Sequence, residues 1–269
     1  MFAASAANPS FAADPRVRAQ ALSDVRAAIA STPVDPTLLR MLRDQIRSRF
    51  GSAHVRLRSS SNTEDLPGFT GAGLYTSVSV AADVGDPKLD VADGLRTVWA
   101  SLWQLRAYDE REQALVDHEL AAMGVLVEPA FTNERANGMA ISRDVLDPIY
   151  GDAYYFNAQA GEASVTNPAP GVTSEQGTYQ GNVPPRIDYS SHSSLMSGAV
   201  VTAAELETLM CNLGAIHNHF QARLDPMHLN RWFAMDDEWK LIGPERQLVV
   251  KQARPFFGRA DVPTDCREF

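Results

Sequence analysis

The stretch VRLRSSSNTEDLPGFTGAG, residues 55–73, begins with a strand pattern and ends in a glycine-rich segment. Apolar Val55 and Leu57 alternate with arginines, which predicts a strand over residues 54–60 with one buried face. The remainder is dense in serine, asparagine, proline and glycine, which favours a loop. Arg58 stands where the strand enters that loop. A guanidinium beside the amides of a glycine loop is suited to holding phosphates. A plain hairpin-forming loop is the alternative.

Two better-known kinds of phosphate-binding glycine loop are excluded. The chain has no Gly-Lys pair and therefore no Walker A motif. The loop also precedes a strand, whereas a dinucleotide-binding loop joins a strand to a helix. Lysine occurs only at Lys88, Lys240 and Lys251. We therefore expect phosphate contacts to come mostly from arginine and from backbone amides.

The composition of the 269 residues is that of a globular protein, with 45% hydrophobic and 21% charged residues. A net charge of −9 argues against sequence-independent binding to nucleic acid or to an anionic membrane. No apolar run approaches the roughly 20 residues of a membrane helix, and no signal-peptide pattern is present. Two cysteines cannot build a four-ligand zinc site. We expect a soluble, cytoplasmic protein.

Helix and strand patterns are mixed along the chain without a βαβα rhythm. Helices are predicted over residues 16–31, 35–50, 90–121 and 202–223. Strands are predicted over residues 74–80, 124–128, 138–142, 152–158 and 162–166, and in a C-terminal hairpin of residues 232–241 and 248–254. An exposed loop is predicted over residues 167–187, a disordered tail over 1–15 and a C-terminal tail over 259–269. This order predicts the α+β class.

The first strand of the C-terminal hairpin concentrates acidic residues. It contains the sequence MDDEWK at residues 235–240. Because side chains alternate between the faces of a strand, Asp236, Glu238 and Lys240 are expected on one face and Asp237 on the other.

The second strand of the hairpin supplies an amide and a guanidinium. Alternation places Gln252 and Arg254 on one face and Lys251 with Ala253 on the opposite one. A carboxylate, an amide oxygen and a guanidinium on a shared face suit a Mg²⁺–phosphate site, because Mg²⁺ takes oxygen ligands and keeps several from water and phosphate. Ion pairing across a solvated sheet face is the alternative.

Residues 55–73 resemble the VRSS…ED-L-P…AG signature of the ATP-binding domain of phosphoenolpyruvate synthase (pyruvate, water dikinase) and pyruvate phosphate dikinase. Rifampicin phosphotransferase has a related domain. Further segments follow in the family's order: WASLWQLRAYDERE (99–112), GVLVEPAF (124–131), NGMAIS (137–142), QAGE (159–162), MDDEW (235–239) and KQARP (251–255). The resemblance covers about residues 25–256.

The resemblance implies an ATP-grasp-like domain over residues 16–258, with nucleotide between two α+β subdomains and a hinge near 127–131. It also implies a set of roles. Arg58 and Arg254 would be catalytic residues that contact the phosphates, Gly73 and Ser77 would line the phosphate loop, Glu128, Ala130 and Phe131 would hold the adenine, and Glu238 and Gln252 would bind Mg²⁺.

The implied activity is phosphoryl transfer from ATP to a histidine on a separate swivelling domain, which passes the phosphate to a phosphoenolpyruvate/pyruvate domain. The final acceptor is set by those partner domains. The family has a lysine-bearing segment before its first helices, and no lysine precedes Arg58 here. Three alternatives therefore stay open: a non-catalytic nucleotide-binding or regulatory module, a truncated relic of such an enzyme, and an inert interaction domain.

Overall fold

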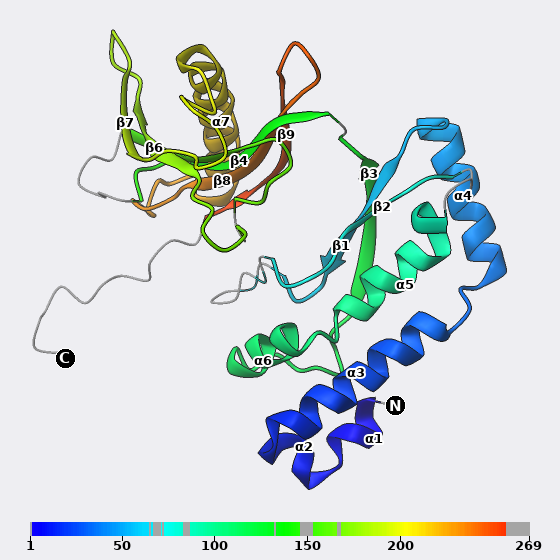
Figure 1. Cartoon of the computed structure of the whole chain (residues 1–269). Helices are drawn as coiled ribbons and strands as arrows, with labels where there is room; N and C mark the ends of the chain where they lie inside the picture. The colour runs from blue at the N-terminus through cyan, green and yellow to red at the C-terminus, as the bar shows by residue number, and fades with distance from the viewer. Residues whose placement is uncertain are drawn as a thin grey trace, which may run out of the picture. The chain divides into compact units, whose positions relative to one another are not determined.

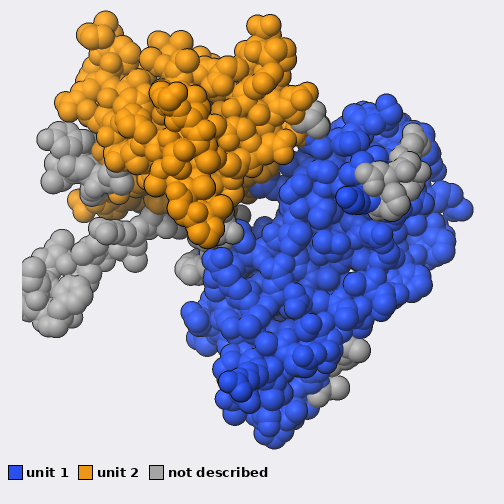
Figure 2. Space-filling view, viewed as in Figure 1, with its two compact units in different colours: residues 1–130 blue, residues 131–269 orange. Residues whose placement is uncertain are grey.

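The computed structural model describes residues 2–64, 66, 71, 73–82, 87–131, 133–145, 153–165 and 168–256. The chain forms two compact units, residues 1–130 and 131–269, which are described separately (Figures 1 and 2). The boundary lies within residues 127–131, where the sequence predicts a hinge. The predicted C-terminal tail lies outside the described residues.

Unit 1 combines helices with a small antiparallel sheet in the strand order β2-β1-β3. Its elements are α1 (Phe2–Ala6), α2 (Pro9–Ala13), α3 (Pro15–Ser31), α4 (Pro36–Phe50), β1 (Val55–Ser61), β2 (Val78–Val80), η1 (Pro87–Leu89), α5 (Val91–Ser101), α6 (Leu105–Gln113) and β3 (Met123–Pro129). The predicted start and end of α4 are confirmed. The Asp35 side chain accepts from the Leu38 amide, and Gly51 ends the helix at a φ of 62°.

The core of unit 1 forms where β1 meets α5. Val55 and Leu57 are fully buried in a cluster with Val91, Leu95 and Val98. The alternation seen in the sequence thus directs the apolar side of β1 inward. Arg56 and Arg58 are left on the opposite face of the sheet.

Three predicted elements of unit 1 differ from the structure. The predicted tail over residues 1–15 contains α1 and α2, because Phe11 is buried against Leu22 and Tyr108. The predicted helix over residues 90–121 is interrupted between α5 and α6, where Gln104 takes an extended conformation. The predicted strand over 74–80 is shortened to β2.

Unit 2 is a six-stranded antiparallel sheet in the order β7-β6-β5-β4-β8-β9, with α7 packed on one face (Figure 1). Its elements are β4 (Glu134–Ile141), β5 (Ala153–Ala160), β6 (Glu175–Gln180), β7 (Arg186–Ser191), α7 (Ala203–Leu224), β8 (Met235–Ile242) and β9 (Gln247–Pro255). The mixture of helices and antiparallel sheets confirms the predicted α+β class.

Two sequence expectations in unit 2 are wrong. Residues 161–165 form turns and irregular backbone, not a strand. The predicted exposed loop over 167–187 contains β6 and the start of β7. Gly177 in β6 is closely packed, since a Cβ there would lie 2.5 Å from the Asp188 carbonyl oxygen. Within the described part of the chain, every helix is too short or too polar to cross a membrane.

A methyl group at Gly138 is expected to destabilise unit 2. A Cβ there would lie 2.1 Å from the Asn157 carbonyl oxygen and 2.4 Å from the Trp239 ring. We predict that Gly138→Ala lowers the free energy of unfolding by about 3 kcal/mol, because neither backbone nor a buried ring can move away cheaply. Thermal unfolding measures this. Gly181→Ala is the control, since its Cβ would meet nothing within 4 Å; equal melting temperatures for the two variants would contradict the prediction.

Candidate functional site

The strand β8 presents a polar face and a core face. Its alternate residues Met235, Trp239 and Leu241 pack in the cluster beneath α7. Asp236 and Glu238 lie on the opposite face, where β9 places Arg254 directly across from Asp236 and Gln252 directly across from Glu238. The sequence prediction that these four side chains share one face is confirmed. We call this the acidic hairpin face.

Ion pairs connect the two strands across the acidic hairpin face. Arg254 donates from Nε and Nη2 to Oδ2 of Asp236 at 3.0 and 2.9 Å. Lys251 Nζ donates to Oε2 of Glu238 at 2.8 Å. Each acidic side chain therefore has a basic neighbour, and the Arg254 guanidinium is held in a fixed orientation by two nitrogens.

The position of Lys251 corrects the sequence analysis. Regular alternation predicts that Lys251 lies with Ala253, away from Gln252. The register instead shifts between Glu238 and Trp239. Glu238 lies opposite Gln252 and Trp239 lies opposite Val250, so Lys251 is the extra residue of a β-bulge. A bulge redirects the side chain of the inserted residue. Lys251 therefore lies on the same face as Gln252.

The donor chemistry of the acidic hairpin face fits a hard divalent cation. Gln252 Oε1 is buried and has no hydrogen-bond partner, which leaves an amide oxygen available beside the Glu238 carboxylate. Among the described residues, no group of three or more His, Cys, Asp or Glu side chains could hold a metal ion. The protein would then supply only one or two oxygens, the number typical of Mg²⁺ bound with phosphates and water.

Sequence reasoning missed Asn157. This residue is connected by cross-strand pairing to Glu238 of the acidic hairpin face. Asn157 lies opposite Met139 on β4, which lies opposite Glu238 on β8. Its Oδ1 is buried and has no hydrogen-bond partner. The signal in the sequence is a pair of amide side chains, Asn157 and Gln159, two residues apart within the largely apolar strand AYYFNAQA. The orientation of Asn157 depends on the strand pairing.

Asp237 lies on the core face of β8 and is fully buried. Neither of its carboxylate oxygens has a hydrogen-bond partner. Burial, and next the negative charge of Asp236, raise the pKa of Asp237 from 3.8 to about 7. The face of this side chain was predicted correctly, but its burial came from α7, which covers that side of the sheet.

In unit 1, the structure brings Arg58 and Glu128 together. Arg58 Nη1 lies 3.6 Å from Oε1 of Glu128, and each side chain is 16% exposed. They lie diagonally across the β1–β3 pair, because Arg58 is opposite Leu126 and Glu128 is opposite Arg56. The pair combines a guanidinium with a carboxylate on one partly buried face.

The other residues implied by the resemblance belong to both units. Ser77 Oγ accepts from the Ser59 amide at 3.2 Å, which ties the entry to β2 against β1. Gly73 is exposed in a turn with φ of 71°. The Ala130 amide donates to the His54 carbonyl in unit 1. Phe131 belongs to unit 2, where its ring lies 5.9 Å from Lys240 Nζ.

A buried arginine docks the segment after Gly73 onto α6. The guanidinium of Arg111 is fully buried and donates to the Tyr75 hydroxyl at 3.2 Å and to the Leu102 carbonyl at 2.8 Å. Gln104 adds a hydrogen bond to Thr76 at 2.8 Å. These bonds explain why the helix predicted over 90–121 breaks, since Leu102 and Gln104 lie in the interruption.

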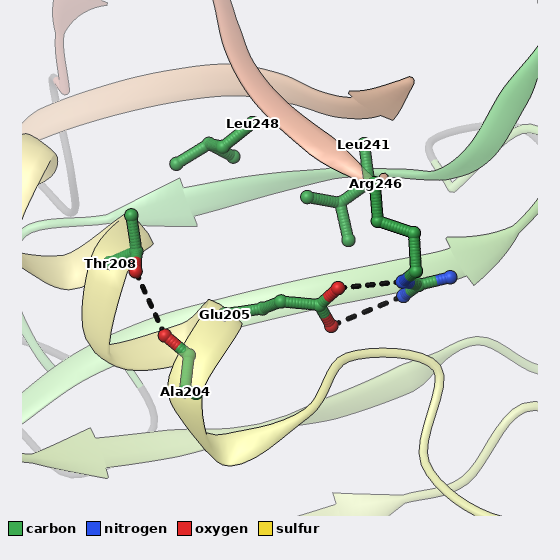
Figure 3. A pocket seen from close by; sticks show the side chains of 6 residues that line it. All are labelled: Ala204, Glu205, Thr208, Leu241, Arg246 and Leu248. Carbon is green, nitrogen blue, oxygen red and sulfur yellow. Dashed lines mark hydrogen bonds and ion pairs between the residues drawn. The ribbon is translucent and has the colours of Figure 1, made fainter. Parts of the chain in front are cut away.

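A cavity of about 200 Å³ lies on the α7 side of β8 and β9 and is lined by Ala204, Glu205, Thr208, Leu241, Arg246 and Leu248. Figure 3 shows the Glu205 carboxylate pointing toward the Arg246 guanidinium. Arg246 also donates to the Val200 carbonyl, and Glu205 closes the capping box of α7. The charged groups of Glu205 and Arg246 therefore pair with each other, and this ion pair links the turn between β8 and β9 to the start of α7.

Comparisons with known proteins give a consistent result. A family model described as "Pyruvate phosphate dikinase, AMP/ATP-binding domain" matches residues 8–261. The phosphoenolpyruvate synthase of Aeropyrum pernix is 31% identical over 135 residues, which are 48% of this chain and 15% of that protein. The phosphoenolpyruvate synthase of Pyrococcus furiosus is 32% identical over 106 residues, 38% of this chain and 12% of that protein. The match thus spans less than a sixth of the length of these curated relatives.

Asp237 is expected to make stability fall as pH rises. Its pKa is higher in the folded chain than in the unfolded one, so the folded state binds the proton more tightly. The stability that comes from this tighter proton binding is fully present below about pH 4 and is lost by about pH 7. Asp237→Asn removes this dependence. Its stability relative to the wild type should be greater at pH 8 than at pH 5, by a few kcal/mol at most, since one pKa unit is about 1.4 kcal/mol.

Chemical denaturation at both pH values measures this effect. The control is Asp24→Asn, which removes an exposed carboxylate of α3. A difference between Asp237→Asn and wild type that stays constant from pH 5 to pH 8 would show that Asp237 does not titrate in this range.

Loss of the Arg111 guanidinium is expected to destabilise unit 1 strongly. Arg111→Met leaves the Tyr75 hydroxyl and the Leu102 carbonyl without their buried donor, at a cost of about 3 kcal/mol or more. Arg106→Met on the same helix removes an exposed arginine paired with Glu110 and should cost under about 0.5 kcal/mol. Urea unfolding compares the two; similar midpoints would refute the docking role.

Proposed function

The chain belongs to the pyruvate phosphate dikinase AMP/ATP-binding domain family, and on that premise we propose that it binds ATP with Mg²⁺ as the nucleotide-binding module of a dikinase-type phosphotransferase. This agrees with the resemblance found in residues 55–73. Within this proposal the two units are the subdomains of an ATP-grasp-like fold. The phosphate acceptor is a histidine on a separate swivelling domain, followed by a phosphoenolpyruvate/pyruvate domain.

The observation that carries the proposal is the strand register of the acidic hairpin face. The pairing of β8 with β9 sets the Glu238 carboxylate opposite the Gln252 amide, and Asp236 opposite Arg254. Glu238 and Gln252 would hold Mg²⁺ through oxygen atoms. Arg254 would contact phosphate, and its bonds to Asp236 keep the planar guanidinium oriented for that contact.

Residues of unit 1, together with Phe131 at the start of unit 2, would contribute the remaining nucleotide contacts. Arg58 would neutralise phosphate charge, while the exposed turn at Gly73 and the Ser77 hydroxyl would form the phosphate loop. The adenine would lie against Glu128, with the backbone at Ala130 and Phe131 reading its edge. Because the Ala130 amide already donates to His54, recognition there would use other backbone groups.

In the proposed reaction, a P–O bond of ATP breaks as a histidine nitrogen of the swivelling domain forms a P–N bond, and the shortened nucleotide departs with the electron pair of the broken bond. Positioning and charge neutralisation are the main contributions that a protein makes to phosphoryl transfer. Arg58 and Arg254 would stabilise the negative charge of the transferring group. When bound, Mg²⁺ would neutralise the phosphate oxygens further.

A non-catalytic nucleotide-binding or regulatory module is the second candidate. It is favoured by the contact of Arg58 with Glu128, since a guanidinium that neutralises a carboxylate has less charge available to stabilise a transferring phosphoryl group. ATP binding without phosphate transfer to an added histidine-bearing swivelling domain would support this candidate over the enzyme module.

Isothermal titration with ATP, with and without Mg²⁺, tests the proposal. We expect Mg²⁺-dependent binding that weakens at least about tenfold in Glu238→Gln and in Arg254→Gln, because each loses a charge-assisted contact. Glu245→Gln removes an exposed charge in the hairpin turn and should leave binding unchanged. A folded wild-type chain that binds no ATP at millimolar concentration would overturn the proposal.

A further inference from the structure

The bulge in β9 places a lysine on the acidic hairpin face. The residues on either side of Lys251 pair in order, Gln252 with Glu238 and Val250 with Trp239, so Lys251 has no residue opposite it. An unbroken strand would have directed Lys251 toward α7, with Ala253. The inserted residue interrupts the regular pairing of the two strands. Bulges often occur next to functional sites, where they redirect a side chain.

The ammonium group of Lys251 lies against the carboxylate of Glu238. Nζ donates to Oε2 of Glu238 at 2.8 Å, and the two side chains are 25% and 34% exposed. Solvent and ligands therefore reach both groups, and an ion pair that water screens in this way contributes little to stability. So weak a contact can be exchanged for a stronger one.

The other two lysines have different surroundings. Lys240 is on the same strand face as Glu238, but its ammonium pairs with Glu134 and lies over the ring of Phe131. Lys88 lies in η1 of unit 1. Lys251 is thus the lysine whose charge is positioned next to the proposed Mg²⁺ ligands.

We propose that Lys251 is the lysine that contacts the polyphosphate of ATP in this chain, an inference that rests on the proposed ATP-binding function. A cation bound by Glu238 would stand beside the Lys251 ammonium, and the two positive groups would repel each other. A polyphosphate between them supplies the compensating negative charge. Lys251 and Arg254 would then contact the phosphates, and Glu238, released from the lysine, would hold the metal.

The first test compares nucleotides of different phosphate length. Lys251→Gln should weaken Mg²⁺–ATP binding about tenfold or more, the loss of one charge-assisted hydrogen bond, and should leave AMP binding within twofold of wild type. Binding of Mn²⁺ alone, followed by electron paramagnetic resonance, should become tighter because Glu238 no longer pairs with an ammonium. Lys88→Gln, which removes the same charge from unit 1, should change none of these values.

Three outcomes would contradict the proposed role of Lys251, and they show whether the proposed ATP site fails with it. Wild-type affinity for ATP in Lys251→Gln, with binding lost in Glu238→Gln, would overturn the role of Lys251 and leave the ATP site intact. An equal loss of ATP and AMP affinity would also overturn it, since it would indicate a structural effect of the bulge. Absence of ATP binding in the wild-type chain would overturn both proposals.

A second measurement needs no variant and therefore does not depend on the folding of Lys251→Gln. Brief acetylation of the wild-type chain, read by peptide mass spectrometry, gives a rate for each lysine. We expect Mg²⁺–ATP to slow acetylation of Lys251 at least fivefold and to leave Lys88 unchanged. Equal rates at Lys251 with Mg²⁺–ATP and with Mg²⁺ alone, under conditions where ATP binds, would contradict the proposal.

Discussion

The pairing of β8 between β4 and β9 is the constraint on which unit 2 depends. Each residue of β8 from Asp236 to Ile242 has a fixed neighbour on both sides, so the backbone determines which side chains share a face. A shift by one residue would bury Asp236 and Glu238 beneath α7 and expose Trp239. The apolar side of β8 and the packing of α7 therefore set the register that assembles the acidic hairpin face.

The sheet of unit 2 departs locally from regular pairing and packing at three positions. The bulge at Lys251 changes the face of one side chain without moving its neighbours Gln252 and Arg254 out of register. Gly138 allows the Trp239 ring to cross β4 closely. Asp237 is the exception that has no local compensation, because a carboxylate in that position loses its hydration and gains no hydrogen bond.

In unit 1, side-chain hydrogen bonds from a helix, and not strand pairing alone, position the polar groups. Its sheet has only three strands, and the segment that follows Gly73 is held by side chains of α6. Arg111 is central to this arrangement because its buried guanidinium has five donors in a rigid plane. It contacts both Tyr75 and the Leu102 carbonyl, and so joins the loop to the interruption between two helices.

Much of the architecture could be predicted from local patterns. The alternation of residues 55–58 predicted β1, and Asp35 with Gly51 predicted both ends of α4. The hairpin of β8 and β9 and the shared face of Asp236, Glu238, Gln252 and Arg254 followed from a period of two. Family membership also followed from the sequence, since residues 55–73 carry a long motif at fixed spacing. The roles of individual residues toward ATP and Mg²⁺ stay predictions.

The sequence alone determined the α+β class, the family and the chemical types of the candidate site residues, because these depend on residue identity and local periodicity. Only the tertiary structure decided the face of Lys251, the burial of Asp237, the break before α6 and the strands within residues 167–187. Each of these depends on a contact between residues distant in sequence: pairing with β8, packing of α7 on the sheet, the hydrogen bonds of Arg111, or the close contact at Gly177. Local patterns contain no information about such contacts.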